Sequence, residues 1–204
     1  MTIKRKKEKY SQNLLDGVSR TTHLVNQLLT LSRLDPDSKN IEKEKFNFED
    51  LVQSVLESHI QKAERKDLIL EVNCYVKEEK LFIEANQTYI EIMIGNLIDN
   101  AIKYSPNDKK ISILISEKNN LLSFKISNFG ERIMAEEIEK LFNNFYRVNR
   151  LKTAKDNIGC GLDLAIAKKI ADLHAAKISF ESRDGVNSVT VIFLGALPAH
   201  GAVT

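Results

Sequence analysis

The sequence contains few of the residues that would mark a disulfide scaffold or a zinc centre. Its 204 residues include two cysteines, Cys74 and Cys160, which lie far apart and fit no metal-ligand spacing. The simple interpretation is a protein of a reducing compartment such as the cytosol. The net charge is only +2, so the chain has no global electrostatic bias toward nucleic acid. We therefore expect no nucleic-acid partner.

Long hydrophobic runs are also missing. No apolar stretch approaches the roughly 20 residues that a membrane-spanning helix needs, and no signal peptide is visible. The composition is 43% apolar and 28% charged, which excludes wholesale disorder and predicts that this chain is soluble. The length allows one large domain, or one ordinary domain with an appendage.

The first part of the chain has the pattern of one long amphipathic helix. From Tyr10 to Leu31, apolar residues recur mostly at spacings of three, four or seven. Asp35-Pro36 then breaks the helix. Because a lone helix cannot bury such a stripe, we expect residues 1–36 to pack against a partner helix, in this chain or another.

After a charged linker at 37–45, the pattern becomes a mixture of strands and helices. The periodicity predicts an α+β domain over residues 46–197 and a loose tail at 198–204. Helices are expected at 49–66, 88–104, 135–142 and 162–173. Strands are expected at 46–48, 68–73, 80–84, 110–116, 122–127, 177–182 and 188–194.

The helix at 88–104 carries an unusual polar stripe on an apolar background. Asn96, Asn100 and Lys103 recur at i, i+4 and i+7 and so share one face. Two amide oxygens with a lysine one turn further on could hold a hard cation and a phosphate together. The alternative is an Asn-rich helix end that Ser105-Pro106 simply terminates. The spacing alone does not separate the two interpretations.

The long irregular segment at 128–161 favours the binding site. Compact domains rarely contain such a segment unless it is a lid or a binding loop. It ends in Gly159-Cys160-Gly161-Leu162, where a helix begins. Glycines before a helix let backbone N–H groups approach an anion.

Four blocks of sequence follow one another in a fixed order: 96–106, 128–133, 142–148 and 159–166. They resemble the N, G1, F and G2 boxes of bacterial two-component sensor histidine kinases. Residues 24–34 resemble the end of that family's second dimerisation helix. The leucine-rich helix is most similar to the quorum-sensing and polymyxin-resistance type. The resemblance implies a two-layer α/β sandwich of the kind shared with gyrase and the Hsp90 chaperones, preceded by part of a four-helix-bundle dimerisation domain.

The resemblance also implies ATP and Mg²⁺ as ligands, with one end of the site on the polar helix. Asn100 would be the main Mg²⁺ ligand, with Asn96 beside it. Lys103 would reach a phosphate, and Tyr104 would pack on the adenine. In the related ATPases the position of Asn96 holds a Glu that activates water. An amide cannot take a proton at neutral pH, which favours phosphoryl transfer over hydrolysis.

The other implied site residues lie in the later blocks. Asn128 stands where the family usually has an Asp that reads the adenine amine, and Gly130 lets the backbone approach the base. Arg147 could neutralise charge on the transferring phosphoryl group. The implied set is completed by Gly159 and Gly161 around the phosphates, by Phe142 and Phe145, which would seat the lid or serve as core aromatics, and by Ile133 and Leu162.

None of the four histidines has the sequence context of a phosphoacceptor. In this family the acceptor is followed by an acidic residue, an arginine or lysine, and a proline one turn on. This context is missing at His23, His59, His174 and His200. We therefore expect the chain to start after the acceptor helix, to bind ATP–Mg²⁺, and not to phosphorylate itself. His59 is expected at a surface or interface, and His174 as a cationic ring at a helix carboxyl end.

By resemblance, the parent protein would be a homodimer through its first helix and would sit at the inner membrane with this portion in the cytoplasm. It would pass phosphate to the receiver domain of a response regulator.

Four positions depart from the family pattern and weaken the site hypothesis. They are Asn128, Arg132 and Ile158 in place of Asp, Gly and Gly, and Asp163 in place of a Gly. A carboxylate near a triphosphate repels it, so we expect weakened nucleotide affinity. Two alternatives stay open: a degenerate module that binds and regulates other kinases, and a chaperone- or gyrase-like ATPase.

Overall fold

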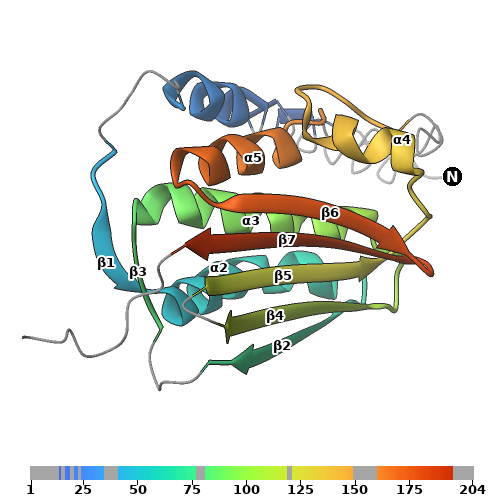
Figure 1. Cartoon of the computed structure of the whole chain (residues 1–204). Coiled ribbons are helices and arrows are strands. Elements are labelled where there is room, and N and C mark those ends of the chain that lie inside the picture. The colour runs from blue at the N-terminus through green and yellow to red at the C-terminus, as the bar shows by residue number, and fades with distance from the viewer. Residues whose placement is uncertain are drawn as a thin grey trace, which may run out of the picture.

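Five strands form one mixed sheet in the order β2-β4-β5-β7-β6 (Figure 1). The computed structural model describes residues 14, 17–18, 21–22, 24–34, 41–76, 81–118, 121–148 and 160–194. The strands of the sheet are β2 (Ile69–Tyr75), β4 (Lys110–Lys118), β5 (Leu121–Phe129), β6 (Lys177–Arg183) and β7 (Val186–Leu194). β2 is parallel to β4, and the other neighbours are antiparallel.

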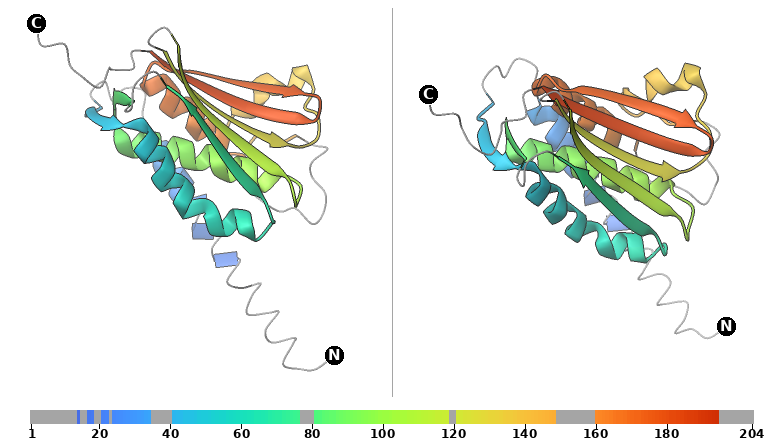
Figure 2. Two further views of the ribbon diagram at one scale, coloured as in Figure 1. Left: turned by 90° about the horizontal axis from the view of Figure 1, so that it is seen from below. Right: turned by 60° about the horizontal axis from the view of Figure 1, so that its bottom comes forward.

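One face of the sheet is covered by helices α2 (Phe48–Glu64), α3 (Gln87–Tyr104) and α5 (Asp163–Leu173) (Figures 1 and 2). Alternate residues of β4 point to these helices, so Ile111, Ile113 and Ile115 are fully buried. α3 lies between α2 and α5 and carries much of the core. The helix with the predicted site is therefore held on both sides.

Asparagine side chains set where the two long helices begin. The Asn47 side chain accepts a hydrogen bond from the Glu49 N–H at 3.0 Å, and that of Asn86 accepts one from the Tyr89 N–H at 3.0 Å. β1 (Glu44–Asn47) and β3 (Phe82–Ala85) end at these caps and pair as a separate antiparallel sheet.

The amino-terminal segment is helical at 24–33 and rests against this domain. Leu34 is 1% exposed and belongs to the core, and Leu24 and Leu31 pack against it. On the other side of the segment, Val25, Leu28 and Leu29 are exposed. The stripe is thus only partly covered by this chain.

The predicted α+β sandwich is confirmed, and every predicted helix and strand from residue 46 to 194 has a counterpart. Phe48 begins α2 instead of ending a strand, because Asn47 is the cap. The helix predicted at 135–142 is a turn of α4 (Ala135–Ile138) followed by the 3₁₀ turn η1 (Glu139–Phe142). The domain boundaries at 36, 45 and 197 stay predictions, and the tail at 198–204 lies outside the described residues. No helix of the described part combines the length and apolarity needed to cross a bilayer.

Two histidine predictions are wrong. His59 is 8% exposed and buried between α2 and α3, where its Nε2 lies 3.3 Å from Asp99 Oδ1. His174 is not a cationic cap: burial lowers its pKa, its Nδ1 faces the Ile170 carbonyl at 2.8 Å, and its Nε2 accepts the Asn86 N–H at 3.1 Å. A ring that accepts at one nitrogen and donates from the other is neutral. His23 and His200 lie outside the described residues.

Candidate functional site

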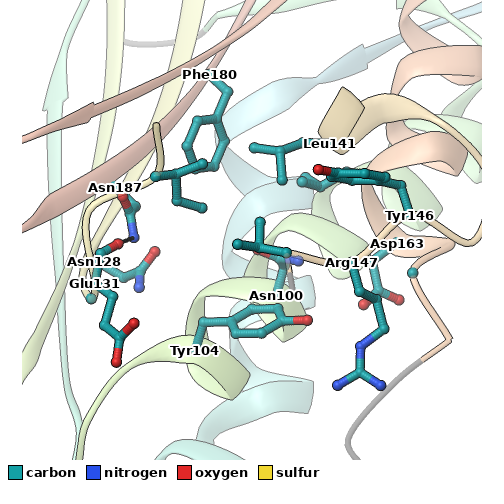
Figure 3. Close-up of a pocket in the computed structure, with 15 residues that line it drawn as sticks. Asn100, Tyr104, Asn128, Glu131, Leu141, Tyr146, Arg147, Asp163, Phe180 and Asn187 are labelled. Atoms are coloured by element: carbon teal, nitrogen blue, oxygen red, sulfur yellow. Dashed lines mark hydrogen bonds between the residues drawn. The ribbon is translucent and has the colours of Figure 1, made fainter. Parts of the chain in front are cut away.

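A cleft lies between the carboxyl half of α3, the start of α5 and the ends of the sheet strands (Figure 3). It is lined by Asn100, Tyr104, Asn128, Gly130, Glu131, Ile133, Leu141, Tyr146, Arg147, Val148, Gly161, Asp163, Leu164, Phe180 and Asn187. Its wall thus combines apolar side chains, such as Leu141 and Phe180, with amides and charged groups.

The polar stripe of α3 faces inward. Asn96 is 8% exposed, Asn100 lines the cleft, and the Lys103 side chain is 11% exposed with its Nζ 4.9 Å from the Tyr104 ring centroid. An Asn-rich helix end at the surface would leave these groups in water. Their burial on one face favours the interpretation as a site for a cation and an anion.

The last turn of α3 is held by a lysine from the turn that follows α2. Lys66 Nζ donates to the backbone carbonyls of Ile102, Lys103 and Ser105 at 2.8, 3.0 and 2.7 Å. These carbonyls lie at the carboxyl end of the helix, where no further turn supplies N–H donors. Lys66 thereby fixes the backbone that carries Lys103 and Tyr104.

The opposite end of the cleft is built from two asparagines on paired strands. Asn128 of β5 is the register partner of Asn187 of β7. The Asn128 amide donates to the Phe129 carbonyl at 2.9 Å, and that of Asn187 donates to the Glu131 carbonyl at 3.1 Å. A Cβ on Gly130 would lie 2.8 Å from Asn187 Nδ2. Gly130 therefore makes room for a side chain of the protein itself, a role the sequence did not indicate.

Asp163, which the sequence marked as adverse, is paired inside the protein. Its Oδ2 lies 3.1 Å from Lys103 Nζ, and the Asp163 side chain is 8% exposed. Its Oδ1 accepts a hydrogen bond from the Gln27 amide, whose nitrogen also lies 3.4 Å from Asn96 Oδ1. The predicted phosphate ligand and the predicted metal ligand are thus both engaged by the chain.

Cys160 completes this cluster. Its thiol donates to Gln27 Oε1 at 3.0 Å. Burial, reinforced by the negative charge of Asp163, raises the pKa of the Cys160 thiol. The thiol therefore stays protonated, in agreement with the interpretation of Cys160 as an inert residue.

The described part of the lid depends on one glycine. Gly161 has φ +75°, and a Cβ there would lie 2.5 Å from the Tyr146 carbonyl oxygen. The Phe145 N–H donates to the Gly161 carbonyl at 3.0 Å, which joins the F-box segment to the start of α5. This junction brings Tyr146, Arg147 and Val148 to the cleft.

The predicted site residues fall into four groups. Those that line the cleft are Asn100, Tyr104, Asn128, Gly130, Ile133, Arg147 and Gly161. Asn96 and Lys103 lie behind it in the buried cluster, while Leu162 is fully buried, Phe142 packs on the core and Phe145 is 60% exposed. Gly159 and Ile158 lie outside the described residues.

Sequence reasoning missed several lining residues, above all Phe180, Asn187 and Tyr146. Phe180 and Asn187 lie on β6 and β7, outside every recognised block. The sequence gives one indication of them. Side chains alternate across a strand, so every second residue of β6 and β7 points to the face of the sheet that α3 covers. Tyr146 lies inside the F block, between Phe145 and Arg147.

The sandwich and its cleft define a class of protein: a nucleotide-binding α/β domain whose site lies over a helix and under a lid. Residues 85–198 match the model of the histidine kinase-, DNA gyrase B- and HSP90-like ATPase family, and the chain belongs to this family.

Sensor protein kinases are among the relatives of this chain. The sensor protein kinase WalK of Staphylococcus saprophyticus is 31% identical over 181 residues, which cover 88% of this chain and 29% of WalK. WalK of Staphylococcus aureus is 30% identical over the same share of this chain and 42% of its own. The chain thus spans less than half of the relatives it matches.

Solved structures agree with the fold. The catalytic domain of histidine kinase ThkA superposes with a TM-score of 0.65 at 26% identity, covering 76% of this chain and 97% of that one. The histidine kinase AdeS of Acinetobacter baumannii has a TM-score of 0.71 at 24% identity, with 90% and 83% covered. The described α/β domain is therefore a domain of the histidine kinase-, DNA gyrase B- and HSP90-like ATPase family, and it is similar in fold to the catalytic domain of the histidine kinase ThkA.

Proposed function

We propose that this chain binds ATP with Mg²⁺ and transfers the γ-phosphoryl group to a histidine on a dimerisation helix, for relay to an aspartate of a response regulator. The observation that carries the proposal is the inward-facing stripe of α3: Asn100 lines the cleft, and Asn96 and Lys103 lie buried behind it. The other end of the cleft is lined by Asn128. Such a cleft can hold a base at one end and a triphosphate at the other.

The stripe supplies the groups that a cation and a phosphate require. Asn100 and Asn96 would hold Mg²⁺ through amide oxygens, which suit a hard cation. Among the described residues, no three His, Cys, Asp or Glu side chains are grouped as metal ligands. When bound, the ion would neutralise phosphate charge. Lys103 would then contact a phosphate oxygen directly.

The remaining residues orient the nucleotide. Asn128 uses its amide nitrogen on the Phe129 carbonyl, which leaves its oxygen as the acceptor for a base amine. Tyr104 would stack on the base. Gly161 and, from the sequence, Gly159 would place backbone N–H groups on the phosphates, and Arg147 would stabilise charge on the transferring group.

The proposal favours transfer over hydrolysis because Asn96 cannot act as a general base. The reacting water of an ATPase would have no proton acceptor at this position. The substrate is accordingly the imidazole of a partner helix, which is a nucleophile when neutral.

The test supplies the acceptor separately. The chain is incubated with [γ-³²P]ATP, Mg²⁺ and a purified dimerisation domain that carries an acceptor histidine. We expect acid-labile label on the dimerisation domain, and none with Asn100→Ala. Phosphate released without any acceptor would instead support the ATPase alternative and refute the kinase assignment.

A second candidate is a degenerate module that binds other kinases without catalysis. The observation that favours it is the ion pair between Lys103 and Asp163, because Lys103, the predicted phosphate ligand, already contacts a carboxylate of the chain. The same assay separates the two: nucleotide binding without any transfer to the supplied histidine would support the degenerate module.

The wider setting is proposed on the same basis. The exposed side of residues 24–33, with Val25, Leu28 and Leu29, fits a homodimer helix of the parent protein. A ThkA structure is described as a complex with the response regulator TrrA, which supports a receiver domain as partner. We also propose a cytoplasmic portion of an inner-membrane sensor, and the quorum-sensing or polymyxin-resistance type on the leucine-rich helix alone.

A further inference from the structure

One glutamine of the amino-terminal segment lies inside the predicted phosphate end of the site. Gln27 is 4% exposed, although its neighbours Val25, Leu28 and Leu29 are open to solvent. Its amide nitrogen donates to Asp163 Oδ1 and lies 3.4 Å from Asn96 Oδ1, and its oxygen accepts the Cys160 thiol at 3.0 Å. Burying a polar side chain costs free energy unless its polar atoms form hydrogen bonds, and the partners of Gln27 provide them.

The partners of Gln27 are the groups that a nucleotide triphosphate would need. Asn96 is a predicted cation ligand, and Asp163 holds Lys103, the predicted phosphate ligand, at 3.1 Å. The Asp163 carboxylate faces Lys103 as an anionic phosphate oxygen would, and the Gln27 amide hydrogens face Asn96 and Asp163 as a cation would. The chain therefore supplies its own substitutes for both charges.

We infer that Gln27 and Asp163 form an internal latch that competes with the triphosphate and its cation, so that docking of residues 24–33 and binding of ATP–Mg²⁺ exclude one another. The latch rests on the proposed function, since it regulates the same site. Lys103 cannot contact Asp163 and a phosphate with full strength at once, and a cation at Asn96 displaces the Gln27 amide.

Two consequences follow from thermodynamic linkage. If docking of the segment weakens triphosphate binding by some factor, triphosphate binding weakens docking by the same factor. The segment that leaves the site also carries the exposed apolar side chains of the first helix. Nucleotide binding would thus release the helix from its own catalytic domain and leave it available to a partner helix.

The latch makes different predictions for different ligands. Adenosine has a base and a ribose but no phosphates, so it can bind while Gln27 stays in place. A non-hydrolysable triphosphate such as AMP-PNP with Mg²⁺ requires Gln27 to leave. The ratio of the two affinities therefore reports the latch, whereas binding of either ligand reports the site itself.

The test measures both affinities by calorimetry on the full chain with Gln27→Ala. We expect AMP-PNP–Mg²⁺ to bind about three- to tenfold more tightly than to the wild type, since about one net hydrogen bond no longer has to be broken. Adenosine affinity should not change. The matched control is Gln53→Ala on α2, an exposed glutamine whose amide donates to Glu57 Oε1 at 3.2 Å, and it should change neither affinity.

A second measurement needs no variant. Hydrogen exchange of the wild-type amides at 24–33 should accelerate with AMP-PNP–Mg²⁺ and stay unchanged with adenosine. Asp163→Asn keeps the size of the side chain but removes the negative charge that pairs with Lys103. It should raise triphosphate affinity, as Gln27→Ala does.

The outcomes separate the two proposals. If no nucleotide binds to the wild type or either variant, the proposed function fails. If AMP-PNP binds equally to the wild type, Gln27→Ala and Asp163→Asn, and exchange at 24–33 does not respond, the site stands and the latch is refuted.

Discussion

Lys66 is expected to contribute more to stability than any exposed lysine of the chain, because it caps the helix that carries the site. One ammonium group donates to three backbone carbonyls at the end of α3, at 2.7, 2.8 and 3.0 Å. The variant Lys66→Met keeps most of the aliphatic stem but removes all three donors.

The magnitude follows from the number and the kind of these bonds. A hydrogen bond from a charged donor contributes roughly 1.5–3 kcal/mol net, and a cation at a helix carboxyl end adds about 0.3–1 kcal/mol. The three bonds share one charge and the carbonyls can be rehydrated, so the terms do not add. We expect Lys66→Met to lower the free energy of unfolding by about 2–3 kcal/mol, a large part of the roughly 5–15 kcal/mol of a typical domain.

Urea denaturation at pH 7 measures this loss, and a second lysine provides the control. Lys110 pairs with Glu71 at 2.7 Å, but the two side chains are 48% and 42% exposed. Lys110→Met should therefore cost at most about 1 kcal/mol. Equal losses for the two variants would refute the argument that Lys66 stabilises the end of α3. Nucleotide affinity should fall only for Lys66→Met, since Lys103 and Tyr104 lie in the affected turn.

Three further predictions concern groups around the site. Burial lowers the pKa of His174 below 6.5. The stability from its hydrogen bond to the Asn86 N–H should therefore be present above pH 6.5 and fall as the pH drops below that value. Urea midpoints measured from pH 5 to 8 should show this decrease in the wild type and lose it in His174→Gln. Burial alone would raise the pKa of Asp99, but hydrogen bonds from His59 and Lys62 of α2 hold it below 3.8. Asp99→Asn should therefore destabilise the protein at pH 7, and this difference from the wild type should decrease as the pH falls below 3.8. Gly161→Ala should lower the melting temperature and weaken AMP-PNP binding, because φ is +75° and the new Cβ would meet the Tyr146 carbonyl at 2.5 Å.

The sequence predicted most of the fold because local patterns are strong in this chain. Alternating apolar residues predict the strand at 110–116, which is β4, and helical spacing predicts the helix at 88–104, which is α3. Pairings between distant segments have no such local signal. The parallel contact of β2 with β4 and the separate β1–β3 sheet are set by how the helices pack, so neither could be deduced from periodicity.

Site residues could be predicted where they lie together on one helix or in one sequence block. They could not be predicted where only the fold brings distant segments together. Asn96, Asn100 and Lys103 share a face by spacing alone. Asn187 reaches the cleft only because its strand pairs with the strand of Asn128. Gln27 reaches the cluster across 136 positions of sequence from Asp163, and no motif marks it.

The two departures Asn128 and Asp163 have a joint meaning that neither has alone. At the base end of the cleft an amide, Asn128, stands where the family has a carboxylate, and Glu131 lies beside it (Figure 3). At the phosphate end a carboxylate is present, 3.1 Å from Lys103. The phosphate end is compensated before any ligand arrives, so an incoming triphosphate must replace an existing ion pair to reach Lys103. In a buried site the affinity then depends on the difference between two strong interactions, Lys103 with Asp163 and Lys103 with the phosphate. A comparison of motifs cannot give this difference. The change at position 163 is therefore better understood as a competitor placed inside the site than as the loss of a binding residue.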